Sequence, residues 1–99
     1  QIFFMLYNNK IILMNINQLI AIVKNKLETE IIIQDLKIED KSFLHKNHKG
    51  HQEGKFHLKL MISSDELAKT SKIDSTKKIY GILDSELKEH IHSIQILLN

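Results

Sequence analysis

Six histidines are the residues of this chain best suited to chemistry, and three of them lie close together. His45, His48 and His51 follow one another at intervals of three residues in a polar stretch, so two imidazoles could converge on one metal ion. A zinc or iron site normally takes further ligands from elsewhere in the chain. The candidates for that role are His57, His90 and His92. The same spacing is equally compatible with a solvated polar loop.

The chain contains no cysteine, which limits the chemistry that it can perform alone. It can form no disulfide and can offer neither a thiolate nucleophile nor a cysteine ligand to a metal. The sequence also lacks the motifs G-x-x-x-x-G-K-[ST], G-x-G-x-x-G and G-x-S-x-G, which are typical of phosphate sites, dinucleotide sites and nucleophile elbows. Histidine and carboxylate must therefore carry any metal chemistry.

Two further histidines bracket Ile91 at the expected exit of a helix into the last strand. There, His90 or His92 can bind a metal, or can simply interact with the carbonyl end of the helix, which attracts a partly positive ring. His57 alternates with the apolar residues of its strand, so its side chain is expected to be exposed on the sheet or to lie against the polar loop.

Lysines on the second predicted helix offer a different kind of site. Lys72, Lys77 and Lys78 could face phosphates together with Lys69. However, the formal net charge is only +2, four acidic residues are interspersed, and the chain has no arginine. An ordinary solvated helix face explains the same lysines.

Hydrophobic periodicity predicts the elements that must position these residues. They are a helix at about 16–30 capped by Asn15, a strand from Ile32 to about 40, a polar loop at 41–54, a strand at 56–63, a helix from Ser71 to about 89 and a strand over 94–98. The expected core stripe of the second helix is Ile73, Lys77 through its stem, Tyr80, Leu83 and Leu87. This order, α-β-β-α-β, predicts an α+β fold in which helices pack on one face of a three-stranded mixed sheet.

The 99 residues suit one compact domain. We expect the domain to occupy residues 14–99, with Met14 as a natural start, and residues 1–13 to be a flexible extension. The apolar patches of that extension are too short to span a bilayer, so no membrane association is expected.

Three blocks of sequence, in register over about 16–98, resemble the BolA family. Asp40-x-Ser42-x-x-His45 resembles D-x-S-x-x-H, and His48-x-Gly50 resembles the H-x-G of a longer loop variant. The stretch 57–67 resembles H-F-x-V-x-x-x-S-x-x-F, and the stretch 79–94 resembles V-Y-x-x-L-x-x-E-L-x-x-x-I-H-A-L. One departure is clear, because the family's R-H-R is replaced by Ser75, Thr76 and Lys77.

The resemblance implies a class II KH-like fold and a partner, a monothiol glutaredoxin. The two proteins would share a 2Fe-2S cluster in iron-sulfur trafficking or iron sensing, with the other ligands supplied by the glutaredoxin and glutathione, and no cofactor is expected in the isolated chain. By the match, His92 ligates the cluster with His45, and His48 is the alternative second ligand. The resemblance also implies that the protein is not an enzyme.

The resemblance also keeps an alternative open, a DNA-binding transcriptional regulator that uses the KH-like surface and Lys72, Lys77 and Lys78. The G-x-x-G loop of RNA-binding KH domains is absent from the sequence. We expect a bacterial cytoplasmic protein, with an organelle matrix as the alternative, and a homodimer of the free chain is left open.

Overall fold

The computed structural model describes residues 2–7, 10–42 and 56–99, and side chains from residue 15 onward. Its elements, in chain order, are β1 (Ile2–Tyr7), β2 (Lys10–Asn15), α1 (Ile16–Glu30), β3 (Asp35–Asp40), β4 (Phe56–Ser63), α2 (Asp65–Ala68), α3 (Lys72–Ile82), α4 (Asp84–Glu89) and β5 (Ile91–Leu98). Most of the predicted polar loop lies outside the described residues.

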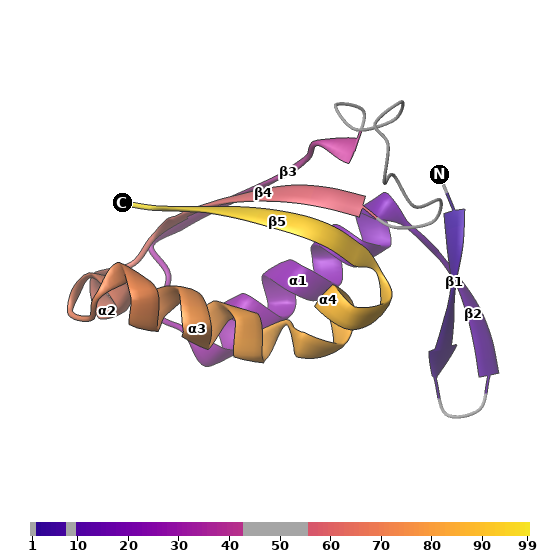
Figure 1. Ribbon diagram of the computed structural model, residues 1–99, viewed down its shortest axis with the longest axis horizontal. Helices are drawn as coiled ribbons and strands as arrows, with labels where there is room; N and C mark the ends of the chain where they lie inside the picture. The colour runs from indigo at the N-terminus through magenta and orange to yellow at the C-terminus, as the bar shows by residue number, and fades with distance from the viewer. Residues whose placement is uncertain (1, 8–9, 43–55) are drawn as a thin grey trace.

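The strands β3, β4 and β5 form a three-stranded mixed sheet in that order. β3 runs antiparallel to β4, and β5 runs parallel to β4. The helices α1, α3 and α4 lie on one face of this sheet (Figure 1). The predicted α+β fold with the order α-β-β-α-β is therefore confirmed.

The strand directions bring three separate segments to one end of the sheet. β3 ends where β4 and β5 begin, so residues 40–42, 56–57 and 91–93 meet there. We call this region the histidine end, because it contains His57 and His92. The core lies between the sheet and the helices and consists of Leu19, Val23, Leu27, Ile31, Phe56, Leu58, Leu60, Ile62, Leu67, Ile79, Leu83 and Ile91.

Helix α1 begins and ends at the predicted residues. The Asn15 side chain accepts a hydrogen bond from the Gln18 backbone N–H, and the Gln18 side chain accepts one from the Asn15 N–H. This reciprocal capping box satisfies two N–H groups that a helix start otherwise leaves without partners. The helix buries Leu19, Val23 and Leu27, at the expected spacing of one face.

The second predicted helix differs from the prediction in both its length and its buried face. It is interrupted at Leu83, which separates α3 from α4. The expected core stripe was wrong in part, because Ile73 is 69% exposed and Tyr80 is 45% exposed. Lys77 is exposed as well, whereas Leu83 is buried as predicted. The other buried residues of this face are Ser75, Ile79 and Glu86.

Polar residues explain this rotation of the helix. The Ser75 hydroxyl donates to the Leu67 carbonyl and lies 2.7 Å from the Thr70 hydroxyl oxygen. Because these bonds satisfy the hydroxyl, Ser75 can be buried at little cost. A hydrophobicity pattern counts Ser75 and Glu86 as surface residues and so selects the wrong face.

The first strand of the sheet begins at Asp35, three residues later than predicted. Ile32 lies in the preceding connection and is exposed. The Ile32 carbonyl accepts a hydrogen bond from the Ser64 hydroxyl, and its N–H donates to the Glu66 carboxylate. These bonds hold its backbone outside the ladder between β3 and β4.

Before α1, the described residues form a second, two-stranded sheet in which β1 and β2 are antiparallel. The expected boundary at Met14 falls inside β2, which leads directly into α1. Within the expected extension, residues 2–7 and 10–13 therefore lie in strands. That this segment is flexible relative to the rest of the chain stays a prediction.

Candidate functional site

His92 is the second residue of β5, and its side chain is exposed at the histidine end. The pairing of β4 with β5 shifts here, since Phe56 is opposite Ile91 while His57 is opposite Ser93. His92 is thus the extra residue of a β-bulge. Bulges redirect a side chain at the end of a ladder and are common beside functional sites.

His57 lies next to this bulge and is only 4% exposed, so of its two expected placements, exposure on the sheet was wrong. Its ring centroid lies 4.9 Å from that of His92, with an angle of 63° between the ring planes. Its Nδ1 atom lies 2.6 Å from the Ser93 hydroxyl oxygen. The neighbouring strand therefore covers His57 and fixes the orientation of its ring against His92.

The motif Asp40-x-Ser42 ties the end of β3 to the same place. The Asp40 carboxylate accepts hydrogen bonds from the Ser42 N–H, at 2.9 Å, and from the Ser42 hydroxyl, at 2.5 Å. The Ser42 oxygen in turn accepts the His57 N–H at 3.0 Å. The Lys41 N–H donates to the His57 carbonyl at 2.7 Å. These residues therefore anchor the chain beside His57 just before the segment 43–55.

The candidate ligands His45 and His48, together with His51, lie outside the described residues. Hydrogen bonds nevertheless hold the chain in place on both sides of them. Ser42 is bonded to His57 before the segment, and after it the Phe56 N–H donates to the His90 carbonyl at 2.9 Å. Among the residues that the structure describes, no group of three or more histidines and carboxylates is arranged to hold a metal ion.

His90 is buried at the end of α4, unlike the exposed His92. Its backbone N–H donates to the Glu86 carbonyl, so the residue closes the last turn of the helix. The Glu86 carboxylate is itself buried and accepts two hydrogen bonds from the Lys26 ammonium, at 2.8 and 3.0 Å. These contacts make His90 and Glu86 parts of the scaffold that leads into β5.

A shallow hollow of about 340 Å³ opens beside the two histidines. It is lined by Lys41, His57, Leu58, Lys59, Ser93, Ile94 and Gln95. Two of these residues are lysines, but the Lys41 ammonium binds the Glu39 carboxylate at 2.8 Å, so part of the positive charge beside the hollow is compensated.

The lysines predicted as a phosphate-facing patch do not form one cluster. Lys77 and Lys78 follow Lys72 by five and six residues and are adjacent to each other. At these spacings the three side chains point to different sides of α3. The Lys78 ammonium binds the Glu66 carboxylate at 2.9 Å. This contact has the largest effect on the pKa of Glu66 and lowers it. The hydrogen bond from the Ile32 N–H lowers this pKa further.

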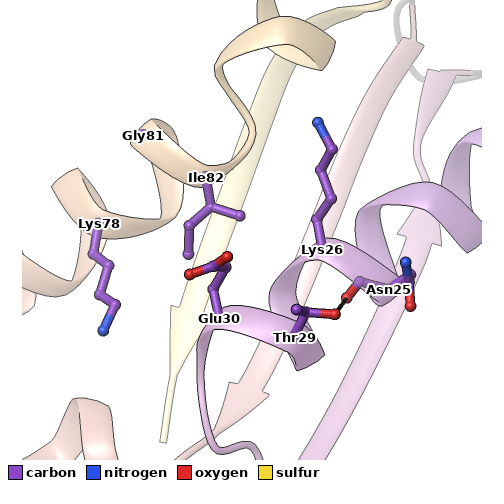
Figure 2. Close-up of a pocket in the computed structure, with 7 residues that line it drawn as sticks. All are labelled: Asn25, Lys26, Thr29, Glu30, Lys78, Gly81 and Ile82. Atoms are coloured by element: carbon purple, nitrogen blue, oxygen red, sulfur yellow. Dashed lines mark hydrogen bonds between the residues drawn. The ribbon is translucent and has the colours of Figure 1, made fainter.

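A second hollow, of about 550 Å³, lies between α1 and α3, away from the histidine end (Figure 2). Its lining includes Lys26 on one wall and Lys78 on the other. Both ammonium groups already bind carboxylates, of Glu86 and Glu66 respectively. The groove therefore presents little uncompensated positive charge to a phosphate.

Sequence reasoning identified His92 but missed the buried contact of His57 with Ser93. One signal was available, because Ile91 and Ile94 are both apolar although they are three residues apart. A regular strand would place them on opposite faces. The bulge at His92 lets both residues point toward the core side, and it therefore exposes the histidine.

The fold and this site define a small α+β domain that presents a histidine from the bulged start of its last strand. The family model described as BolA-like protein matches residues 27–99. The chain belongs to the BolA-like family.

Individual relatives agree with this assignment. The chain is 31% identical over 80 residues to SufE-like protein 1, chloroplastic/mitochondrial, of Arabidopsis thaliana, and the match covers 76% of this chain and 22% of that protein. It is 31% identical over 77 residues to the DNA-binding transcriptional regulator BolA of Haemophilus influenzae, with 78% of this chain and 72% of the relative covered. It thus spans about a fifth of the Arabidopsis protein and most of the Haemophilus one.

A solved structure, the BolA domain of SufE1 from Arabidopsis thaliana, superposes with a TM-score of 0.67 at 30% sequence identity. The match covers 80% of this chain and 87% of that domain. In the described part of the chain, none of the helices has the length and apolar composition needed to cross a membrane.

Proposed function

We propose that this chain is a non-enzymatic adaptor that pairs with a monothiol glutaredoxin and helps to coordinate a shared 2Fe-2S cluster through His92. The observation that supports the proposal is the bulge at the start of β5, which exposes His92 beside the well-anchored ring of His57. A scaffold histidine such as His90 is buried, whereas a ligand to a shared cluster must reach the surface of the domain.

The donor set of the chain suits half of such a site. Without cysteine, it offers neutral imidazoles, which can complete an iron site whose other iron is held by thiolates, as in Rieske-type centres. The glutaredoxin cysteine and glutathione would supply those thiolates. When bound, the cluster would make the pair a carrier or sensor of iron and sulfur.

The second ligand is proposed to be His45, with His48 as the alternative. His45 follows Ser42 by three residues, and Ser42 is bonded to His57. Three residues of extended chain span at most about 11 Å, and six span about twice that distance. The covalent tether is therefore tighter for His45 than for His48, which favours His45.

The proposal is tested by mixing the chain with a monothiol glutaredoxin that carries its cluster. Visible absorption and circular dichroism should change as the ligands of the cluster change. His92→Ala should abolish this change, and His51→Ala should not, because His51 is not a proposed ligand. Comparing His45→Ala with His48→Ala identifies the second ligand. An unchanged spectrum with the wild-type chain, or a full response of His92→Ala, contradicts the proposal.

A second candidate function, DNA-binding regulation, is favoured by one observation, the name of the Haemophilus influenzae relative. It predicts DNA binding that weakens steeply as salt is added, because phosphate contacts release counterions. Lys72→Glu and Lys77→Glu should weaken a gel shift if α3 contacts the DNA. The scattered positions of these lysines and the Lys78–Glu66 ion pair favour the adaptor.

The two relatives suggest different locations for the protein. We propose a bacterial cytoplasm, because one relative comes from the bacterium Haemophilus influenzae, with an organelle matrix as the alternative, as the name of the Arabidopsis thaliana relative suggests. Fractionation with an antibody to the chain distinguishes the two.

A further inference from the structure

The two edge strands of the three-stranded sheet differ in how they are protected. The strand β3 carries Asp35, Lys37, Glu39 and Asp40, and its charges form ion pairs along the edge. The strand β5, with the sequence IHSIQILL, carries no lysine, arginine, aspartate, glutamate, proline or glycine. Charged residues and proline are the usual protection of an edge strand against pairing with another chain. Only the β3 edge has that protection.

The outer side of β5 offers a regular set of backbone partners. The Asn99 N–H donates to the Ile62 carbonyl of β4, so Asn99 is one of the residues that direct their backbone groups toward β4. In a parallel pair, alternate residues direct both N–H and C=O to one neighbour. After the bulge, therefore, Ile94, Ile96 and Leu98 direct these groups away from β4. Among the described residues, no strand pairs with that side of β5.

The side chains along this edge are apolar and incompletely covered. Ile94, Ile96 and Leu98 pack against the core from its rim and are only partly buried. On the other face of the sheet, Leu97 is 39% exposed. A strand added to this edge would remove apolar surface from water on both faces, in addition to satisfying the free backbone groups.

We propose that a second copy of this chain pairs with β5 in antiparallel orientation, with the two-fold axis at Ile96. The outward residues are spaced symmetrically about Ile96, so Ile96 would face its own copy, while Ile94 would face Leu98 of the partner subunit. Each such pair exchanges two backbone hydrogen bonds, which gives roughly six in all. The two sheets would join into one continuous sheet.

The chemistry of β5 favours a second copy over a foreign strand. An isologous contact places each residue against a residue of the same strand, so any charge would create like-charge contacts near the axis. The strand has none over 91–98 apart from a protonated His92. In the proposed register, apolar side chains meet apolar side chains on the core side, and Gln95 meets Leu97 of the partner subunit on the outer face. This dimer does not depend on the proposed function.

Sedimentation equilibrium and light scattering on the full chain test the proposal through a pair of matched double variants. Gln95→Lys combined with Leu97→Lys places like charges opposite each other across the axis. Gln95→Lys combined with Leu97→Glu places opposite charges there and leaves the rest of the strand unchanged. Both positions are exposed, so both variants should fold, as circular dichroism can verify.

We expect wild type and the opposite-charge variant to dimerise, and the like-charge variant to show at least a tenfold larger dissociation constant. A wild-type chain that stays monomeric up to millimolar concentration overturns the proposal. So do assemblies larger than two chains, or dimerisation that is equal in the two double variants.

The absence of cysteine allows a direct test of the register. Ile96→Cys places the sole thiol on the axis, where the Cα separation of a hydrogen-bonded pair, about 5.5 Å, suits a disulfide. Mild oxidation should cross-link this variant, and should not cross-link Lys37→Cys on the exposed β3 edge. Equal cross-linking of the two variants, or none of Ile96→Cys under conditions where the chain dimerises, overturns the proposed register.

Discussion

Two of the places where the chain buries polar side chains serve different purposes. On the helix side, the ion pair of Lys26 and Glu86 joins α1 to α4, and its carboxylate side chain is 4% exposed. Both oxygens of the Glu86 carboxylate accept a hydrogen bond from the Lys26 ammonium. Its contacts fix how the helices pack before β5 begins.

At the histidine end, the polar side chains form a chain of contacts instead of a closed pair. Asp40 binds Ser42, Ser42 binds His57, and His57 contacts both Ser93 and the ring of His92. The last member, His92, is exposed. The helix-side pair is thus closed on itself, whereas the contacts at the histidine end lead to the exposed ring of His92, on which the proposed function depends.

The largest effect on stability is expected from breaking the helix-side pair. Lys26→Met keeps the apolar stem but leaves the Glu86 carboxylate buried without its cation. Removing one partner of a fully buried pair costs about 3–5 kcal/mol. Because the Lys26 side chain is 38% exposed, water can partly replace it, and we expect about 2–3 kcal/mol in urea unfolding.

Lys24→Met is the matched control for that variant. Lys24 is exposed on the same helix and forms no ion pair among the described residues, so its loss should leave stability nearly unchanged. Both variants should respond normally to a cluster-bearing glutaredoxin. A spectral defect in Lys26→Met at temperatures where it is folded would place the helix-side pair within the site.

A smaller effect on stability and a larger one on function is expected at Asp40. Asp40→Ala removes the acceptor of two hydrogen bonds from Ser42, a buried residue. A hydrogen bond to a charged group contributes about 1.5–3 kcal/mol, and because Asp40 is only half-buried we expect a loss of about 1–2 kcal/mol. The spectral response to a cluster-bearing glutaredoxin should also weaken, because the chain before His45 loses its anchor.

Asp35→Ala, at the exposed start of the same strand, should change neither property. If Asp40→Ala lowers stability but leaves the spectral response intact, the anchoring of Ser42 is only structural.

Ser93→Ala probes the contact that the bulge creates. It removes the hydroxyl that lies 2.6 Å from His57 Nδ1 and should cost about 1 kcal/mol. Nitrogen NMR of the imidazoles should report a changed tautomer or orientation of His57, and a shift of the His92 ring that packs against it. Ser85→Ala, exposed on α4, is the control. An unchanged His57 spectrum would mean that the hydroxyl does not orient the ring.

The sequence allowed the fold to be predicted because its apolar periodicity is strong where the core lies. Helix α1 and strand β4 were predicted with correct bounds, since their buried residues are almost all aliphatic. The buried face of α3 was not, because Ser75 and Glu86 are polar and are buried only through specific partners. Such partners come from distant parts of the chain, which periodicity does not detect.

The same reason limits prediction of the site. His92 could be recognised through the family resemblance, but the burial of His57 depends on the register between β4 and β5. A shift of one residue in a strand exchanges its two faces. The spacing of Ile91 and Ile94 indicates an irregularity in β5, but the pairing with β4 is what identifies His92 as the extra residue.

The smallest effect is expected from Lys78→Ala. This variant removes an ion pair at the surface, so its effect can be compared with the effects at the helix-side pair and at the histidine end. The Lys78 ammonium and the Ile32 N–H lower the pKa of Glu66, whose ordinary value is about 4.3. A carboxyl group with a lowered pKa stabilises the fold above its unfolded-state pKa, and this contribution is lost as the pH falls through the folded-state value. The stability difference between wild type and Lys78→Ala should thus be small at pH 7 and should disappear as the pH falls through the lowered folded-state pKa of Glu66. Added salt should also reduce it, because both groups are accessible to water. Thermal unfolding at several pH values measures the difference, and a difference that persists at pH 3 would show that the lysine stem, and not its charge, supports the contact between α3 and α2.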